Sequence, residues 1–388
     1  MGDTRLLNYV ECNPTVKLKK GEFYNLVDID SITVGVKYSD NKGLVEYTGQ
    51  SGSKFSKGDT IMARITPCLE NGKIAMYNGD VNSIGSTELF VFRAIPNVSN
   101  KDFVYYFMKQ NSVRNYAANS MTGASGRQRA DIKFIKKLKC SFPHLETQNK
   151  IADILSTYDE LIENNNKRIA ILEQMAENLY KEWFVRFRFP GYETAEFENG
   201  IPVGWEVKKL FDVANVKYGY AFKSDLFCDD ESLNPVVRIR DIPNNKTNTY
   251  TTEQCDERYL ITENSIVIGM DGIFHMCLWN GGKAYLNQRV VEIESKIENL
   301  NNLHLYYVIY PQVKYWEQTI SGTTVAHLGD KHLKKMTVIL PSEDISKKAK
   351  EIFDSIMLQK CKLFKQNENL IKQRDLLLPR LMSGKLEV

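Results

Sequence analysis

The chain of 388 residues lacks the features that export, membrane insertion or covalent cross-linking would require. It has no run of about 18 apolar residues, and the opening MGDTRLLNYV has no positive segment followed by an apolar one. The seven cysteines are odd in number and form no CxxC pair, and the five histidines are scattered. We therefore expect a cytoplasmic protein with neither a disulfide framework nor a metal site.

Motifs for catalysis and for cofactor binding are also missing. Gly281-Gly282-Lys283-Ala284 has neither the upstream glycine nor the hydroxyl residue of a phosphate-binding loop. Asn13-Pro14 and Asn234-Pro235 lack the following proline and aromatic residue of adenine-amine methyltransferases. No GxSxG occurs, and no acidic residues stand in a spacing that suggests a paired acid and base. We expect a non-catalytic chain without a cofactor.

What the sequence does contain is an internal repeat. GRQRADIKFIKKLKCSFP at 126–143 reappears as TTVAHLGDKHLKKMTVILP at 323–341, and each copy runs into a long heptad-like segment. SKGDTIMARI at 56–65 corresponds to TENSIVIGM at 262–270, and IGSTELFVF at 84–92 to YLNQRVVEI at 285–293. Because identity between the halves is low, we predict one scaffold used twice, with a different recognition surface on each copy.

The positively charged residues are clustered along the sequence rather than evenly distributed. The net charge of +3 excludes a uniformly basic surface, but local clusters can still contact phosphates. A solvated helix face is the alternative interpretation, which the recurrence in both halves disfavours. The clustered cations are Arg127, Arg129, Lys133, Lys136, Lys137 and Lys139 in the first half and Arg238, Arg240, Lys331, Lys334 and Lys335 in the second.

Two long helices are predicted, over 146–186 and 342–378. The predicted apolar seam of the first comprises Ile151, Ile154, Tyr158, Leu161, Leu172, Met175 and Leu179. It is interrupted at Asn165 and Arg168, a pattern that fixes register at a cost in stability. The repeat favours antiparallel pairing of the helices over parallel pairing. An inert spacer or a dimerisation coil is the alternative, but the aromatic and basic run LYKEWFVRFRFPGY at 179–192 favours a docking surface for a partner. Its predicted partner-binding residues are Tyr180, Trp183, Phe184 and Arg186.

These residues resemble a known family. GIPVGWEVKKLFDVANVKYGYAFKSDLF at 200–227 is similar to the opening of a target recognition domain in the specificity (S) subunit of type I restriction-modification enzymes. ETQNKIADILSTYDELIENNNKRIAILEQMAENLYKEWF at 146–184 resembles the central conserved region of that family, and LLLPRLMSGKLEV at 376–388 its C-terminal signature. The first half departs from the pattern because it lacks the GxPxGW opening.

The resemblance implies an α+β protein with two mixed α/β target recognition domains separated by an antiparallel coiled coil. The expected segments are domain 1 at 1–143, a central conserved helix at 144–188, domain 2 at 189–341 and a C-terminal conserved helix at 342–388. Each domain would read one half of a bipartite, asymmetric site in double-stranded DNA. The helices would set the spacer and dock two methyltransferase subunits, through which restriction subunits join.

Residue types on loops between the expected strands suggest which side chains contact bases, since arginine suits guanine and asparagine or glutamine suits adenine. Candidates in the first half are Arg64, Ser86, Thr87, Arg127, Gln128 and Arg129. Candidates in the second half are Lys223, Arg238, Arg240, His275, Asn287, Gln288, Arg289, Thr323 and Thr324. Lys133, Lys136, Lys137, Lys331, Lys334 and Lys335 would contact phosphates.

Two other functions remain open from the residues alone. A structural or adaptor protein would use the coiled coil to assemble partners and its domains to bind proteins, and would have no DNA affinity that depends on sequence. A restriction enzyme with a hidden nuclease core would cleave DNA by itself with a metal ion. The absence of a catalytic constellation ranks the nuclease last.

Overall fold

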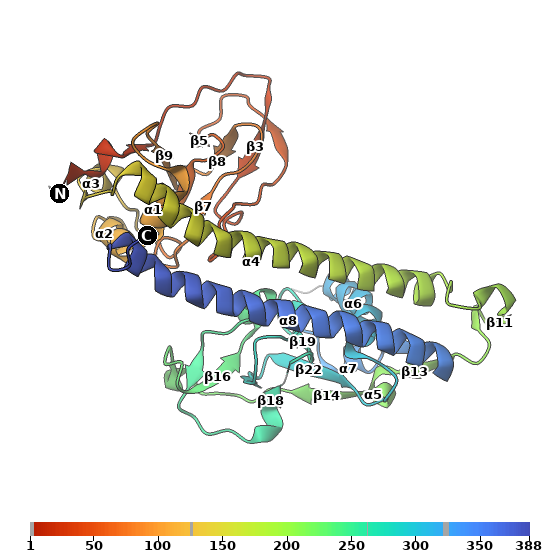
Figure 1. Cartoon of the computed structure of the whole chain (residues 1–388). Helices are drawn as coiled ribbons and strands as arrows, with labels where there is room; N and C mark the ends of the chain where they lie inside the picture. The colour runs from red at the N-terminus through yellow and green to blue at the C-terminus, as the bar shows by residue number, and fades with distance from the viewer. Residues whose placement is uncertain (1–3, 125–126, 262, 321–325) are drawn as a thin grey trace. The chain divides into compact units, whose positions relative to one another are not determined.

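The computed structural model describes residues 4–124, 127–261, 263–320 and 326–388. The chain divides into two compact units, which are described separately. Unit 1 comprises residues 1–166 and 366–388, and unit 2 comprises residues 167–365. Two long helices, α4 (Leu145–Tyr180) and α8 (Glu343–Met382), each contribute one part to each unit (Figure 1).

Unit 1 contains two four-stranded sheets. The first is antiparallel, in the order β2-β9-β6-β7, and the second has the order β4-β3-β8-β5 with β3 and β8 parallel. A short pair, β1 and β10, joins the ends of the domain. The elements are β1 (Thr4–Arg5), β2 (Val10–Cys12), β3 (Phe23–Val27), β4 (Leu44–Glu46), β5 (Ser53–Phe55), β6 (Thr60–Ala63), β7 (Ile74–Met76), β8 (Ser83–Gly85), β9 (Leu89–Ala94), α1 (Lys101–Lys109), α2 (Asn111–Ala118), α3 (Ile132–Ile135) and β10 (Lys139–Cys140).

Unit 2 repeats this topology. Its antiparallel sheet has the order β14-β22-β19-β20, and its second sheet the order β15-β17-β16-β21-β18 with β16 and β21 parallel. The β13–β23 pair corresponds to β1–β10. The elements are β11 (Phe197–Glu198), β12 (Ile201–Pro202), β13 (Glu206–Lys209), α5 (Leu210–Val213), β14 (Ala214–Tyr218), β15 (Phe227–Cys228), β16 (Asn234–Val237), β17 (Tyr250–Thr251), β18 (Leu260–Ile261), β19 (Ile266–Gly269), β20 (Met276–Leu278), β21 (Ala284–Leu286), β22 (Val290–Ser295), α6 (Asn302–Thr319), α7 (Asp330–Leu333) and β23 (Thr337–Leu340).

The same local signals start the same elements in both units. Asn100 and Asn301 are N-cap residues of α1 and α6, and each side-chain oxygen accepts backbone N–H groups of the first turn. β6 and β19 are buried along their whole length, as expected for central strands of a covered sheet. β6 corresponds to β19, and β8 with β9 to β21 with β22, so the predicted internal repeat and the mixed α/β domains are confirmed.

Both helices pack on the sheet domains of their units, and within each unit they run antiparallel. In unit 1, Ile151, Ala152 and Leu155 of α4 and Leu378 and Leu381 of α8 share one core with α1 (Figure 1). In unit 2 the core includes Ala176 of α4 together with Phe353 and Ile356 of α8. The antiparallel prediction is therefore confirmed.

The helix bounds and the seam differ in detail from the predictions. α4 ends at Tyr180 and continues as one π-type turn over Lys181–Val185, while α8 extends to Met382 with Pro379 inside it. Ile154, Leu161 and Met175, predicted for the apolar seam, are exposed. Ile151, also predicted for the seam, is buried, and the other buried positions are Leu155, Ile162, Ile169 and Ala176. The prediction assigned the correct period but partly the wrong helix face, because apolar residues occur on both faces.

Short helical turns complete the chain. They are η1 (Leu6–Asn8), η2 (Lys181–Val185), η3 (Tyr192–Thr194), η4 (Ser224–Leu226), η5 (Ile239–Asn244) and η6 (Glu257–Tyr259). None of the described helices is long and apolar enough to cross a membrane.

Candidate nucleic-acid interface

Three segments of unit 1 meet at the ends of β6 and β9. The backbone N–H of Arg64 donates to the carbonyl of Glu88 at 2.9 Å, and the N–H of Ala130 donates to the carbonyl of Arg64 at 2.8 Å. Thr66 and Gln128 are joined by three hydrogen bonds, of 2.9, 3.0 and 3.5 Å. The structure thus brings together the predicted residues Arg64, Ser86, Thr87, Gln128 and Arg129, which are far apart in the sequence.

The side chains of this cluster are partly engaged with one another. The guanidinium of Arg129 donates to both carboxylate oxygens of Glu88, at 2.7 to 2.9 Å. Arg64 lies over the ring of Phe90 at 5.1 Å, and its buried Nε has no hydrogen-bond partner among the described residues. Thr87 is exposed at the tip of the β8–β9 loop, and Arg127 is exposed next to the residues that are not described. The cluster therefore contains one arginine oriented by a carboxylate, Arg129, and one half-buried arginine, Arg64.

Unit 2 has the same backbone arrangement with other side chains. The N–H of Met270 donates to the carbonyl of Arg289 at 2.9 Å, and the N–H of Leu328 donates to the carbonyl of Met270 at 2.8 Å. Position by position, Asn287, Gln288 and Arg289 stand where unit 1 has Ser86, Thr87 and Glu88, since Ser86 and Asn287 bond equivalent carbonyls at the ends of β3 and β16. His327 stands where unit 1 has Arg129.

The charges at these equivalent positions are rearranged. In unit 2 the acid is Asp271, which contacts Nε of Arg289 at 3.3 Å and Nδ1 of His327 at 2.6 Å. In unit 1 the acid occupies the position of Arg289 instead. The same backbone position therefore carries an acidic side chain in unit 1 and a basic side chain in unit 2. A ligand that contacted each loop in the same way would meet opposite charges there.

Three predicted residues of unit 2 lie next to its second sheet. Arg238 follows β16, and its guanidinium lies over the ring of Phe227 at 5.4 Å. Arg240 donates to Oγ1 of Thr249 at 3.0 Å, and Lys223 has an exposed side chain. Arg238 is adjacent to the Asn287 loop, because Asn287 donates to the carbonyl of Val237 at 3.1 Å. His275 lies at the β19–β20 turn, where its carbonyl accepts from Gly269 at 2.8 Å.

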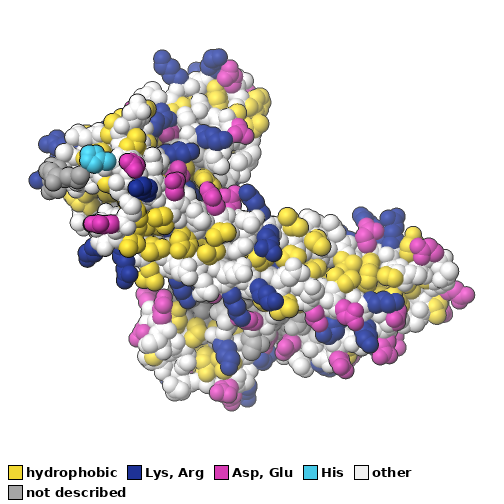
Figure 2. Space-filling model, in the orientation of Figure 1, with side chains coloured by type: hydrophobic (Ala, Val, Ile, Leu, Met, Phe, Trp, Pro, Cys, Tyr) yellow, Lys and Arg dark blue, Asp and Glu magenta, His cyan; other side chains and the backbone are white. Residues whose placement is uncertain are grey.

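The repeated lysines lie on and directly after α3 and α7. Lys133 and Lys137 are exposed and Lys136 is half-buried; Lys331, Lys334 and Lys335 are exposed. Lys334 forms an ion pair with Asp330 at 2.6 Å, whereas no ion pair of Lys136 or Lys137 occurs within the described ranges. Figure 2 shows basic and acidic side chains interspersed on the visible face, in keeping with the near-neutral net charge.

One predicted partner-binding residue is corrected. Phe184 is only 6% exposed and stacks on His304 at 4.0 Å, so it is a core residue rather than a surface residue. Burial also lowers the pKa of His304 to about 3, which keeps its imidazole neutral. Tyr180 and Trp183 are half-buried, and Arg186 is exposed beside Glu182. The aromatic run at the end of α4 thus anchors the helix to unit 2 and leaves a smaller surface than predicted.

Three residues were missed by the sequence interpretation: Glu88, Asp271 and His327. Aligning the two repeats on their final prolines pairs Arg129 with His327, a signal that was available in the sequence. Glu88 and Asp271 carried no such signal, since single acids on loops are common. The predicted residues Thr323 and Thr324, together with Thr262 of the repeat, lie outside the described residues.

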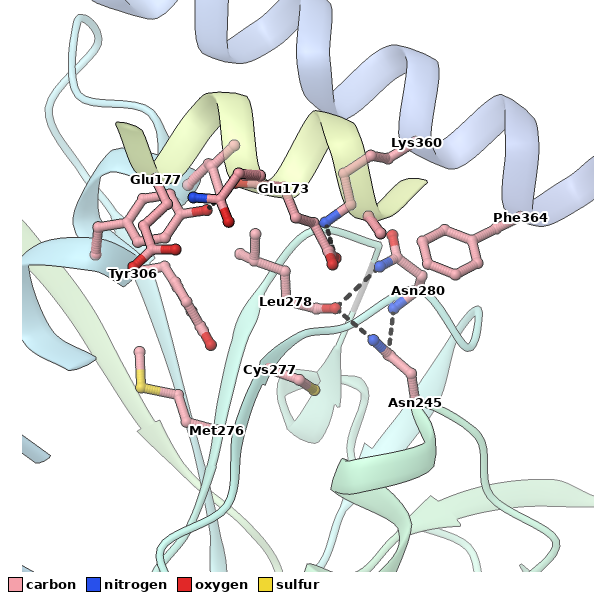
Figure 3. A pocket seen from close by; sticks show the side chains of 14 residues that line it. Glu173, Glu177, Asn245, Met276, Cys277, Leu278, Asn280, Tyr306, Lys360 and Phe364 are labelled. Carbon is pink, nitrogen blue, oxygen red and sulfur yellow. Dashed lines mark hydrogen bonds and ion pairs between the residues drawn. The ribbon is translucent and has the colours of Figure 1, made fainter. Parts of the chain in front are cut away.

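Unit 2 also contains a cavity of about 410 Å³ between its sheet domain and its parts of α4 and α8 (Figure 3). Lys360 donates to Glu173 at 2.6 Å, and the amides of Asn245 and Asn280 both donate to the carbonyl of Leu278. Burial raises the pKa of the Cys277 thiol at this cavity to about 12, so the thiol stays protonated near neutral pH and is a poor nucleophile. In the described part of the chain, no three His, Cys, Asp or Glu residues are grouped to hold a metal ion.

Comparison with known proteins agrees with the repeated architecture. The specificity subunit of the type I restriction enzyme MjaIX from Methanocaldococcus jannaschii is 27% identical over 311 residues, which cover 74% of this chain and 69% of that subunit. The specificity subunit of HindI from Haemophilus influenzae is 24% identical over 416 residues, covering 87% and 88%. The crystal structure of the S subunit of a type I restriction-modification system from M. genitalium has the same fold, with a TM-score of 0.52 at 17% identity over 98% of this chain and 95% of that chain.

The family described as the type I restriction modification DNA specificity domain matches the chain twice, at residues 7–174 and 202–373. These two matches cover both sheet domains and most of both long helices. The chain therefore belongs to the family of type I restriction-modification DNA specificity domains.

Proposed function

We propose that this chain is the non-catalytic specificity subunit of a type I restriction-modification complex. Recognition domain 1 (1–143) reads one half of a bipartite, asymmetric site in double-stranded DNA, and recognition domain 2 (189–341) reads the other half. The observation that carries this proposal is the repeated loop cluster, which has the same backbone hydrogen bonds in both units but different side chains. A repeated scaffold with divergent loops suits two half-sites that differ in sequence.

Base contacts are assigned to the loop residues and phosphate contacts to the lysines. Arg64 and Arg129 in unit 1, and Asn287, Gln288 and Arg289 in unit 2, have the side chains that read guanine and adenine edges. Glu88 and Asp271 orient the guanidinium groups of Arg129 and Arg289. Lysines on and after α3 and α7 contact phosphates, which position the protein on the duplex without reading its sequence.

The helices, at 144–188 and 342–388, set the spacer and dock two methyltransferase subunits, which in turn bind the restriction subunits. Exposed apolar side chains recur along both helices, and a docked protein partner would cover them. On α4 these are Ile154 and Leu161 in unit 1 and Ile171 and Met175 in unit 2, and on α8 they are Leu358 and Leu376. The methyl transfer and the cleavage take place in the partner subunits.

Selection from a pool of random duplexes tests this function. The chain with its methyltransferase subunit is used to retain duplexes, which are then sequenced, and the methyltransferase alone is the control. A bipartite motif with a fixed spacer, enriched only when the chain is present, is the expected result. Retention without any enriched sequence would support the adaptor instead, and cleavage by the chain alone with a divalent metal would support a nuclease.

Lengthening the helices tests the spacer separately. One added turn in α4 together with one added turn at the paired position of α8 keeps the antiparallel pairing. We expect the preferred spacer to lengthen while both half-sites keep their sequences, because the loops are unchanged. A changed half-site would contradict the role of the helices in spacing.

A further inference from the structure

Unit 1 contains another cavity, of about 410 Å³, lined in part by residues of α1, α2 and the C-terminal part of α8. Three cationic side chains line it, one from each helix: Lys109 from α1, Arg114 from α2 and Arg374 from α8. Neither DNA reading nor partner docking, as proposed above, uses these residues.

Each of the three cations has a buried donor without a hydrogen-bond partner among the described residues. These donors are Nζ of Lys109, Nε of Arg114 and Nη2 of Arg374. The side chain of Arg374 is only 1% exposed and that of Lys109 13% exposed, so both cations are largely removed from bulk water. Buried donors normally find a partner, so three such donors on residues around one cavity favour a ligand that supplies acceptors.

The neighbouring carboxylates leave one positive charge in excess. Asp159 bonds Nη1 of Arg374, and Asp375 accepts from Nε of Arg374 at 2.9 Å. Oδ1 of Asp375 lies 4.0 Å from Nζ of Lys109, which is beyond hydrogen-bond distance. Three cations therefore face two carboxylates, and the cavity favours an anion.

The surrounding backbone is also suited to an anion. Gln110, Asn111 and Ser112, at the start of α2, line the cavity, and the side chain of Gln110 does not cap the helix. A helix start carries a partial positive charge and free N–H groups. Gly72 allows Arg114 to approach, because a Cβ atom at Gly72 would lie 2.3 Å from Nη1 of Arg114.

The cavity of unit 2 is lined by residues at other positions and has no such imbalance. Its single lysine, Lys360, is bonded to Glu173, and its amides share a backbone carbonyl (Figure 3). The unpartnered cations are thus a feature of the unit 1 cavity rather than of the repeated scaffold.

We propose that the cavity between α1, α2 and α8 of unit 1 binds a phosphate-class oxyanion, held by Lys109, Arg114 and Arg374. Planar guanidinium groups and an ammonium group match the several acceptor oxygens of such an ion. Because the donors are buried, only a small ion or a single phosphate group can reach them. Its source is free inorganic phosphate or the phosphate of a free nucleotide, rather than the backbone of a duplex.

The test uses the full-length chain and isothermal titration calorimetry with inorganic phosphate, in chloride buffer of constant ionic strength. We expect one saturable site in the wild type. Lys109→Met should weaken phosphate binding about tenfold or more, because it removes one charge-assisted hydrogen bond. Lys101→Met is the matched control on the same helix, where the lysine is exposed, and should bind phosphate like the wild type.

Thermal melting gives a second readout that distinguishes a binding role from a structural one. Phosphate should raise the melting temperature of the wild type but not that of Lys109→Met. Without phosphate, Lys109→Met should be at least as stable as the wild type, since it removes an unpartnered buried ammonium. A wild type indifferent to phosphate, or a Lys109→Met variant that binds phosphate normally, would overturn the proposal.

Two further titrations identify the source of the phosphate. Displacement of phosphate by AMP would support a nucleotide, and binding of phosphate without AMP competition would support the free ion. A duplex that binds in a Lys109-dependent way, in the absence of binding by phosphate or AMP, would overturn the free-ion proposal and assign the cavity to DNA.

Discussion

Two buried polar pairs join the long helices in unit 1, and the equivalent positions of unit 2 are apolar. An offset of 198 residues relates α3 to α7 and α4 to α8, whose first residues are Ile132, Asp330, Leu145 and Glu343. By this offset, the buried pair of Asp159 and Arg374 in unit 1 corresponds to Met357 and Ala176 in unit 2. The bonded pair of Asn165 and Asn367 corresponds to Leu363 and Ile169, which are 3% and 7% exposed.

This difference shows that the repeat conserves backbone geometry rather than the chemistry of its contacts. The junction of unit 1 needs specific partners, because a buried charge or amide is stable only when it is bonded. At the equivalent positions of unit 2, a good fit between apolar side chains is sufficient, although Lys360 pairs with Glu173 elsewhere between the two helices. The reading loops diverge in the same manner, with Glu88 and Arg129 in one unit and Arg289 and His327 in the other.

The largest expected effect follows from breaking the polar junction. Arg374→Ala leaves Asp159 buried with Tyr106 as its remaining donor, and should lower the free energy of unfolding of unit 1 by about 3–5 kcal/mol. Adding Asp159→Met, which reproduces the residues of unit 2, should restore part of this loss. Urea unfolding measures both. A double variant as unstable as the single variant would show that the two junctions are not interchangeable.

The next largest expected effect is a dependence of the free energy of unfolding on pH that distinguishes the two units. Burial lowers the pKa of Lys109 from 10.5 to about 8, with Arg374 and Arg114 adding to the shift and Asp159 and Asp375 opposing it. The folded state therefore binds fewer protons than the unfolded state between these values, so stability rises with pH across that window. Relative to Lys109→Met, the wild type in phosphate-free buffer should gain about 3 kcal/mol from pH 8 to 10.5.

Tyr310 occupies the corresponding position of unit 2, counted from the N-cap residues Asn100 and Asn301, and it is exposed. The free energy of unfolding of Tyr310→Phe should therefore depend on pH in the same way as that of the wild type. Unfolding measured at several pH values checks both variants, and a flat difference between the wild type and Lys109→Met would contradict the burial of an unpartnered ammonium.

Base discrimination should be lost from one half-site at a time. Arg129→Ala should remove about 1–3 kcal/mol of discrimination at one half of the site, and Arg289→Ala a similar amount at the other half. Competition binding with duplexes altered in one half-site measures this. Glu88→Gln, which keeps Arg129 but loosens its orientation, is a milder variant for comparison.

Substitution of the lysines should change how DNA affinity depends on salt, and should leave the sequence preference unchanged. Lys136→Ala with Lys137→Ala should reduce the slope of log K against log salt by about 2, as expected for two lost phosphate contacts. Lys334→Ala with Lys335→Ala should reduce it by about 1, since Asp330 already neutralises Lys334. An unchanged slope in the first variant would remove these lysines from the phosphate contacts.

The smallest expected effect concerns the asparagine pair. Asn165→Leu with Asn367→Ile transfers the apolar layer of unit 2 into unit 1 and should stabilise it by about 1 kcal/mol, because both partners of a buried hydrogen bond are replaced together. Asn367→Ile alone should instead destabilise unit 1, because it leaves Asn165 buried without its hydrogen bond to Asn367. Chemical unfolding of the three proteins checks the sign.

The repeat, the two recognition domains and the antiparallel helices could be predicted from the sequence, because strand patterns and proline-anchored repeats are local signals. The exposed helix face at Ile154 and Leu161 was predicted wrongly, since apolar residues on two faces of a helix cannot be assigned without the partner helix. Phe184 was assigned to the surface because an aromatic run looks the same in a core and at an interface. Arg129 and Arg289 were predicted, but their acids Glu88 and Asp271 depend on long-range contacts.

Sequencing of methylated DNA from cells is the most direct test of two units that read two half-sites. Cells would express the cognate methyltransferase with the wild-type chain, with Arg129→Ala or with Arg289→Ala, or without the chain. The account predicts a bipartite methylated motif that requires the chain, with one half relaxed in each variant and the other half and the spacer unchanged. A variant that altered both halves, or a motif that persisted without the chain, would contradict it.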